Sequence, residues 1–313
     1  MSWKSQEIAA LSVKDIDSLC HIDGSGFLFA PGESLDEYKR RILSVIETME
    51  QFNSELEDKK TIDLDGVPPL EKDSRISPEI LDEAAEITDS QYHFKVDWVP
   101  GFFLAKGVGI LWGGCAVSFH ESPLTLFVIR ANFAKKKRWL LYRRDELLSH
   151  ELCHIARMPI GDRQFEEFFA YRLSPSAFRR YFGGAFRSEA DSIFFILPIF
   201  LLLIIQILVT LSLVNLPILP FWLLAVAYPA YLVVRNQKMR NIARQAVKNL
   251  SRTGVKEPYS VIFRCNADEI RKIATFRKTD DNNAFQKWIS ESEKREIRWK
   301  IIVKKFMSQK QEK

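Results

Sequence analysis

The sequence predicts an α+β protein that combines a mixed soluble part, an apolar helical segment and a basic, mainly helical C-terminal region. Stretches with helical periodicity, such as residues 34–52, occur in the same chain as β-branched and aromatic runs, such as residues 124–130. Residues 192–234 carry no charged side chain. Lysine and arginine are concentrated after that segment, whereas residues 1–98 are rich in aspartate and glutamate. The two charged ends are therefore able to attract each other across the fold.

Composition narrows the class of protein. With 313 residues, 47% of them apolar, the chain has ample material for a packed core, which excludes a disordered tail. Its four cysteines are scattered without a Cys-x-x-Cys pair, so neither a disulfide scaffold nor a four-cysteine zinc ribbon is expected. The pI of about 8.9 arises from basic residues that follow the apolar segment. This placement favours a membrane surface over a specific nucleic-acid partner.

The N-terminal elements follow from local signals. Ser34 and Glu37 form a capping-box pattern at the start of an amphipathic helix over Ser34–Phe52. Residues 59–69 are polar and rich in turn formers, and we expect a loop there. Ser77 followed by Pro78 predicts the start of a second helix.

Strands are expected next, and helices return near the C-terminus. Residues 93–99 and 124–130 have strand character, and residues 102–119 are interpreted as strands or a buried loop. The strand at 124–130 is either an ordinary sheet strand or the edge strand beside which an extended substrate lies. A short strand over 259–264, a helix over 267–276 capped by Asn266, and a basic helix over about 284–307 complete the expectation.

The apolar segment is interpreted as two membrane spans, at about 193–214 and 218–234. About 20 residues cross a bilayer as a helix, so the uncharged stretch is long enough to fold back. Pro217 and Pro220 mark the break, because proline cannot continue a helix. Arginine and lysine flank both outer ends, as at Arg187 and Arg235, and such residues stay on the cytoplasmic side. The prediction is therefore an integral membrane protein in a lipid bilayer, with both termini cytoplasmic.

One motif carries chemistry. His150-Glu151-Leu152-Cys153-His154 places two histidines four residues apart, on one face of a predicted helix, where both imidazoles can reach one Zn²⁺. Glu151 can then act as the general base that takes a proton from water at the metal. Cys153 is expected to face the core, as free cysteine usually does. The helix is too charged to lie inside a membrane, so the site is expected at the cytoplasmic face.

A zinc site with an open position needs a third protein ligand. Glu166 and Glu167 lie at the start of the next predicted helix, but neighbouring helical residues point about 100° apart, so only one of them can ligate. The alternative role for this acidic pair is a favourable charge at a helix N-terminus. His93 and His120 are rival third ligands without a spacing argument.

The motif followed by Glu167-Phe168-Phe169-Ala170 resembles the gluzincin zinc metallopeptidases. The Glu-x-x-Ala element is similar to that of the CAAX prenyl protease family, which implies that Glu167 is the third ligand. That family usually continues with Asp, where this chain has Tyr171. Residues 97–190, including the stretch Trp98–Phe102, also resemble an uncharacterised family of bacterial membrane proteins. The resemblance implies a zincin-like cytosolic catalytic domain.

The predicted organisation has four parts. They are an acidic, mainly helical region (1–90), the zincin-like catalytic domain (91–190), the two-helix transmembrane hairpin (191–235) and a basic, mainly helical region (236–313). Tyr171 lies four residues after Glu167, on the same helix face, and is a possible transition-state stabiliser or a packed side chain. The expected function is hydrolysis of peptide bonds in a peptide or protein substrate. The alternative is a non-catalytic hairpin adaptor that resembles the bilobed inclusion membrane proteins of intracellular bacteria.

Overall fold

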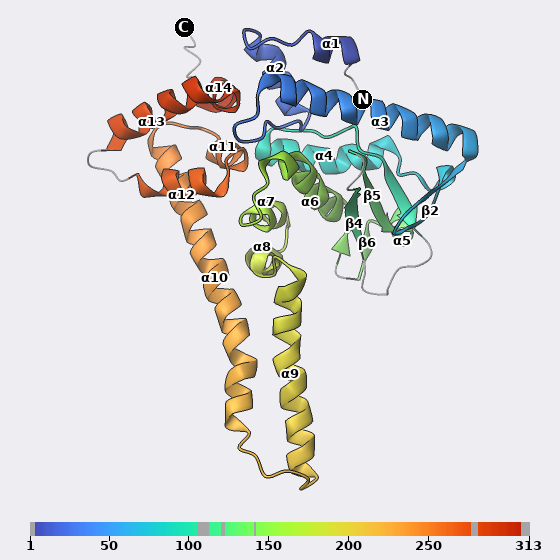
Figure 1. The fold of residues 1–313 in the computed structure, drawn as a ribbon, viewed down its shortest axis with the longest axis vertical. Coiled ribbons are helices and arrows are strands. Elements are labelled where there is room, and N and C mark those ends of the chain that lie inside the picture. Colours follow the sequence, from blue (N-terminus) through green and yellow to red (C-terminus); the bar gives the residue numbers. More distant parts are fainter. Residues whose placement is uncertain (1–3, 105–112, 120–122, 141, 277–280, 308–313) are drawn as a thin grey trace.

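The protein is an α+β chain, and a computed structural model describes residues 4–104, 113–119, 123–140, 142–276 and 281–307 (Figure 1). The helices are α1 (Ser5–Ala9), α2 (Ile16–Gly24), α3 (Leu35–Lys59), α4 (Pro78–Tyr92), α5 (Asn132–Lys135), α6 (Arg144–Arg157), α7 (Glu166–Arg172), α8 (Ala177–Phe182), α9 (Glu189–Thr210), α10 (Leu219–Arg252), α11 (Pro258–Phe263), α12 (Ala267–Thr275), α13 (Asp281–Arg295) and α14 (Ile297–Ile302). Shorter helical turns are η1 (Lys72–Ser74), η2 (Met158–Ile160), η3 (Gly183–Ala185) and the π-helical η4 (Val303–Met307). The strands are β1 (Thr61–Leu64), β2 (Val67–Glu71), β3 (Gly101–Leu104), β4 (Gly114–Ser118), β5 (Thr125–Arg130), β6 (Arg138–Trp139) and β7 (Tyr142–Arg143).

A three-stranded sheet lies between helices and positions the site. Its order is β3-β5-β4, with β3 parallel and β4 antiparallel to the central β5. Side chains of α3 pack on one face, where the rings of Phe52 and Phe102 meet at 6.0 Å. The other face packs on α6, through the cluster that joins Phe127 and Ile129 to Leu148 and other α6 residues. The prediction of a strand at 124–130 is confirmed, but this strand is central, so its alternative role as the sheet edge is wrong. The edge is β4.

Charges on the two ends of the chain meet, as their opposite signs suggested. The buried carboxylate of Asp23, in α2, forms ion pairs with Arg264 at 2.7 Å and with Lys305 at 2.6 Å. Lys304 lies 3.1 Å from Asp17. The C-terminal elements therefore pack against the N-terminal ones at the end of the molecule remote from α9 (Figure 1).

Two long helices, α9 and α10, extend side by side from the rest of the protein (Figure 1). Arg235 of α10 forms an ion pair with Asp191 of α9 at 2.6 Å, and the hydroxyl of Tyr228 donates to the same carboxylate at 2.8 Å. Among the described residues, one helical stretch, Ala190–Thr210, is long and apolar enough to cross a membrane, and only 6% of its most apolar window is buried. Helix α10 starts as an apolar segment but continues into charged residues up to Arg252.

Several helix starts agree with the local signals. The Ser34 hydroxyl accepts from the Glu37 N–H, and Glu37 accepts from the Ser34 N–H, although α3 extends further than predicted, to Lys59. Asn266 and Glu269 form a second capping box at the start of α12. Pro78 is the first residue of α4, as expected.

Three predictions for short segments are wrong. Residues 61–71 form the β1–β2 hairpin rather than a loop, with the turn at Asp65 and Gly66. Residues 93–99 form no strand: Phe94 and Val96 are buried, but the segment pairs with no strand among the described residues. Residues 258–263 form the helix α11 rather than a strand. This run is buried almost throughout, and such a run does not distinguish the two structures by periodicity.

The predicted basic helix over 284–307 is interrupted. It consists of α13, α14 and η4, and the break is at Glu296, whose backbone is extended. The break lets Trp299 enter the core, where its indole N–H donates to Glu269 at 2.7 Å. In the stretch 102–119, β3 and β4 form at the two ends, and residues 105–112 lie outside the described residues.

Candidate metal centre

Helix α6 presents the motif residues to a cavity. The face formed by Leu148, Leu152 and Cys153 is buried in the core, as predicted for the cysteine. The motif side chains His150, Glu151 and His154 lie on the other side and are only partly buried. The helix ends at η2 and Gly161, whose φ of +67° suits glycine, and the chain then turns back into α7. The turn brings the first residues of α7 next to the last turn of α6.

Three potential ligand atoms converge at this turn. The Nε2 atoms of His150 and His154 are 3.1 Å apart. One carboxylate oxygen of Glu167 lies 3.6 Å from Nε2 of His150, and the other lies 3.6 Å from Nε2 of His154. Among the described residues, this is the group of three that could hold a metal ion. Of the two adjacent glutamates, the structure therefore brings Glu167 to the imidazole Nε2 atoms.

The donor set fits a zinc ion. Zinc bonds of about 2.0–2.1 Å in a tetrahedral arrangement place neighbouring ligand atoms about 3.3–3.4 Å apart. The shortest separations between the three side chains, from 3.1 to 3.6 Å, lie around that value, and the two that involve Glu167 are to its two different carboxylate oxygens. Two imidazoles and one carboxylate also match the donor types that catalytic zinc sites use while one position stays open for water or substrate.

Glu166 occupies a different place beside the same histidine. Its Oε2 lies 3.3 Å from Nδ1 of His154, the ring nitrogen that the other cluster residues do not approach. Its Oε1 accepts a hydrogen bond from Nε of Arg157 at 2.8 Å. A carboxylate on Nδ1 keeps the proton there and leaves Nε2 free for a metal, as carboxylate–histidine pairs do in zinc sites. Glu166, at the start of α7, is therefore placed to orient His154.

Arg157 anchors that carboxylate from within the core. Its side chain is fully buried, donates to Asp162 at 3.0 Å and also donates to the carbonyl oxygens of Phe263 and Cys265. The guanidinium carbon lies 4.4 Å from the centre of the Phe169 ring. Asp162 in turn accepts from the N–H groups of Gln164 and Phe165 just before α7. Asp162 thus holds the turn that precedes α7, whose N-cap is Phe165, and the end of α6 is fixed to the start of α7.

Glu151 is held beside the cluster by the sheet edge. The backbone N–H of Ala116, on β4, donates to Oε2 of Glu151 at 3.0 Å. Burial raises the pKa of the Glu151 carboxyl, against the opposing effects of His154 and this hydrogen bond. Because Ala116 points its N–H away from β5 and toward α6, the edge of β4 that faces the site is the one without a partner strand among the described residues. The side chain and the sheet edge are thus next to each other in one cavity.

The pKa values of the two histidines shift in opposite directions. Burial, reinforced by the neighbouring His154, lowers the pKa of His150 to about 3, which favours the neutral, metal-binding imidazole. Burial also favours neutral His154, but the hydrogen bond to Glu166 and the charges of Glu167 and Glu151 outweigh it and raise its pKa. The pKa of Glu167 is raised mainly by burial. These carboxylates supply the negative charge that a cation at the cluster would neutralise.

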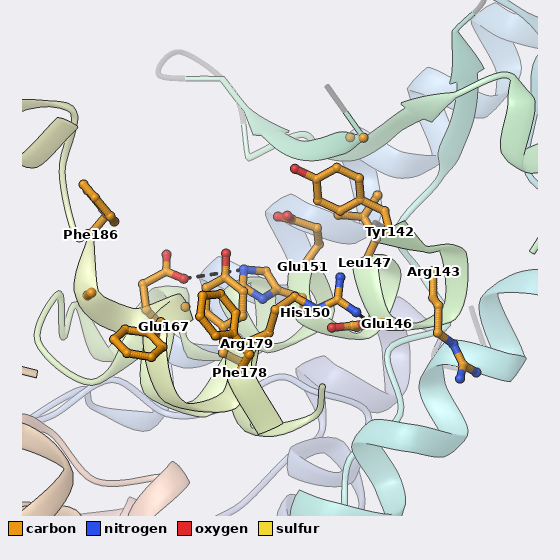
Figure 2. Close-up of a pocket in the computed structure, with 16 residues that line it drawn as sticks. Tyr142, Arg143, Glu146, Leu147, His150, Glu151, Glu167, Phe178, Arg179 and Phe186 are labelled. Atoms are coloured by element: carbon orange, nitrogen blue, oxygen red, sulfur yellow. Dashed lines mark hydrogen bonds and ion pairs between the residues drawn. The ribbon is translucent and has the colours of Figure 1, made fainter. Parts of the chain in front are cut away.

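The cavity, of about 720 Å³, separates α6 from the segment that leads to α9 (Figure 2). The residues that line it are Gly113, Gly114, Tyr142, Arg143, Glu146, Leu147, His150, Glu151, Glu167, Tyr171, Phe178, Arg179, Phe182, Gly183, Ala185 and Phe186. Tyr171 stands edge-on to His150, with ring centres 4.5 Å apart, and burial raises its pKa to about 12. Glu146 and Arg179, which form an ion pair at 2.7 Å, make the polar part of the wall.

Of the two rival ligands, His93 is not part of this site. It lies at the end of α4, 3.6 Å from Glu257 and half exposed, while the candidate metal cluster is built from α6 and α7. His120 lies outside the described residues. Sequence reasoning missed Arg157 and the N–H of Ala116, whose partners are far away in the chain. The one local signal in the sequence was the position of Arg157 itself, nine residues before Glu166, the first residue of the acidic pair.

The chain was compared with family models, with curated proteins and with solved structures, and none of the three comparisons gave a match.

Proposed function

We propose that this protein is a membrane-anchored zinc metallopeptidase whose site faces the cytoplasm. The observation that carries the proposal is the joint placement of three zinc-type ligands and a fourth group that is not a ligand. His150, His154 and Glu167 would hold the ion. Glu151 reaches the same cavity but hydrogen-bonds to the sheet edge. A purely structural zinc site has no need of such a carboxylate and fills four positions with protein ligands.

The roles of the side chains follow from their positions. A bound Zn²⁺ supplies Lewis acidity, which lowers the pKa of water and polarises a peptide carbonyl. Glu151 accepts the proton of the attacking water and returns it to the leaving amine. The raised pKa of its carboxyl suits both steps, the uptake of the proton from water and its release to the amine. The unpaired edge of β4 binds the substrate backbone as an added strand, and Tyr171 donates a hydrogen bond to the oxygen that gains charge.

The membrane anchor is proposed to be a hairpin of α9 and the apolar first half of α10. Leu219, Leu223 and Val226 of α10 are exposed, as are the apolar side chains of α9. Exposed apolar side chains on two adjacent helices are suited to lipid rather than to water. Asp191 and Arg235 pair where the hairpin meets the soluble part, so the charges at that boundary are neutralised. The basic residues after Arg235 then place both termini in the cytoplasm.

A paired experiment tests the peptidase function. Wild type and Glu151→Gln are purified in detergent, and zinc content and hydrolysis of a peptide library are measured for each. Glu151→Gln should keep stoichiometric zinc, because its side chain is not a ligand, and lose about 10²–10⁴-fold in rate, because an amide cannot accept the proton. Glu50→Gln, on the exposed side of α3, is the matched control and should be unchanged.

Two outcomes contradict the assignment. Equal hydrolysis by wild type and Glu151→Gln removes the peptidase function and leaves the non-catalytic hairpin adaptor. Loss of zinc in Glu151→Gln shows that this carboxylate holds the metal and is not the base.

A further inference from the structure

An aromatic ridge forms the wall of the cavity that is nearest to α9. It consists of Phe178 and Phe182 of α8 and Phe186, which follows η3. Their exposed fractions are 69%, 39% and 39%, although all three are large apolar side chains. The same three residues line the cavity together with His150, Glu151 and Glu167. Figure 2 shows Phe178 and Phe186 on the Glu167 side of the cavity.

Packing fixes the ridge to the metal cluster. Gly183, between Phe182 and Phe186, lies against the ring of Tyr171 so closely that a Cβ there would stand 2.2 Å from it. A larger residue would push η3 away from α7. The cavity wall is therefore packed directly against α7, which carries Glu167.

The ridge is also fixed to the start of α9. Arg235 donates to the carbonyl oxygen of Ala185 at 2.7 Å and to Asp191 at 2.6 Å. These contacts clamp the residue before Phe186 to the first turns of α9 and to α10. Once α9 enters a bilayer, the ridge is held a few residues from the point of entry.

Charged residues around the ridge match a lipid surface. Arg180 lies on α8 between two ridge residues and is exposed, and Lys238 and Arg244 are exposed on the adjoining part of α10. Aromatic side chains favour the boundary between headgroups and acyl chains, and basic side chains favour anionic headgroups. The ridge adjoins α9, since the ring of Phe186 lies 5.4 Å from that of Phe195, and the exposed apolar side chains of α9 need the same environment.

We propose that the ridge lies in the headgroup boundary of the bilayer that α9 enters, so that the cavity opens onto this boundary. The substrate is then a membrane-anchored polypeptide that is cut within a few residues of its own membrane segment, with an apolar side chain beside the scissile bond against the ridge. This assignment rests on the proposed peptidase function. It adds the class of substrate and the place of the cut.

The position of the ridge can be measured without catalysis. A fluorophore is attached at Phe178→Cys in the full chain carrying Cys20→Ser and Cys115→Ser, in nanodiscs that contain anionic lipid. Ser54→Cys, on the exposed side of α3, is the control, and α3 lies in the part of the protein remote from α9 (Figure 1). Headgroup-labelled nitroxide lipid should quench position 178 and not position 54. Quenching of position 178 by an aqueous quencher alone overturns the proposal, provided that zinc content shows a folded site.

The second measurement uses wild-type protein and the best-cleaved soluble peptide of a library. The peptide is compared with the same sequence fused directly to a polyleucine–alanine membrane segment in the same nanodisc. A third form carries a spacer of about twenty Gly/Ser residues, which reaches roughly 25 Å. The directly fused form should be cut at least about tenfold faster than the spaced form, because its bond is held at the cavity at a high effective concentration.

The outcomes separate the two proposals. Equal rates for all three forms overturn the membrane-proximal substrate and leave the peptidase intact. Faster cutting of the spaced form than of the directly fused form also overturns the membrane-proximal substrate and leaves the peptidase intact. Absence of hydrolysis of every form by zinc-loaded protein overturns both.

Discussion

Glu166 and Glu167 are neighbours in the sequence, but their replacement should affect zinc affinity to different degrees. Glu167 lies within 3.6 Å of both Nε2 atoms, whereas Glu166 contacts only Nδ1 of His154, at 3.3 Å. Glutamine at either position keeps the size of the side chain and removes the charge. The pair Glu167→Gln and Glu166→Gln therefore compares a metal ligand with a residue that orients a ligand.

The expected magnitudes differ by about one order. Structural zinc sites with four ligands bind with about 10–16 kcal/mol, or about 2.5–4 kcal/mol per ligand, so Glu167→Gln should weaken zinc binding by about 10²–10³-fold. Loss of a carboxylate partner of a ligating histidine typically costs 10–100-fold, about 1.4–2.7 kcal/mol, and this range is expected for Glu166→Gln. Because the glutamine oxygen still accepts from Arg157, the lower part of the range applies.

The assay is a competition titration of each purified variant against a chromophoric zinc chelator, with thermal unfolding of the metal-free proteins as a control for folding. Stronger loss of zinc in Glu166→Gln than in Glu167→Gln would refute the assignment. Retention of full affinity in Glu166→Gln would show that the contact with Nδ1 does not orient His154. In that case the alternative role of Glu166, a charge at the start of α7, would be sufficient.

Three further predictions concern stability and topology. Zinc at about 100 times its dissociation constant should stabilise the wild type by about 2.7 kcal/mol, seen as a lower unfolding temperature in chelator, and His150→Ala should show no zinc effect. Burial opposes ionisation of Asp23, but Arg264 and Lys305 outweigh this effect and lower the pKa of its carboxyl. The contribution of Asp23 to folding stability is therefore fully present above about pH 4 and is lost as pH falls through the lowered pKa. Urea unfolding between pH 7 and pH 3 should therefore show a steeper loss of stability for wild type than for Asp23→Asn, and parallel curves would contradict this. Reporter fusions at Met1 and Lys313 should both score cytoplasmic, and one external terminus would contradict the two-span hairpin.

Local signals in the sequence were sufficient where a structure depends on residues close together in the chain. The capping boxes of Ser34 with Glu37 and of Asn266 with Glu269 are hydrogen bonds between residues three positions apart. The histidine pair belongs to the same class, because four residues in a helix bring two side chains to one face. Such features need no knowledge of the rest of the fold.

The sequence was misleading where contacts between residues far apart in the chain decide the secondary structure. Residues 93–99 alternate between buried and exposed as a strand does, but the N–H of Lys95 bonds to the carbonyl of Gly24 rather than to a sheet. Residues 259–264 are β-branched and aromatic, and they form a helix because they pack among rings, such as that of Phe263 on Tyr92 at 4.3 Å. Propensity is a weak prior, and tertiary packing overrides it.

The same limit applies to the site. The metal ligands follow from spacing and from a resemblance, but the support of His154 does not. Arg157 reaches the carbonyl oxygens of Phe263 and Cys265, more than a hundred residues later in the chain and beyond both long helices. No pattern within a short window contains that contact.

This contact makes the C-terminal region part of the metal centre. The guanidinium of Arg157 lies between the rings of Phe169 of α7 and Phe263 of α11, at 4.4 and 5.4 Å from their centres. It also pairs with Glu166, which bonds to His154. If α11 shifts, the buried guanidinium loses its carbonyl partners, and a hydrogen bond to a charged group typically contributes about 1.5–3 kcal/mol. The orientation of His154, which precedes α9 and α10, thus depends on packing by a segment that follows these two helices in the chain.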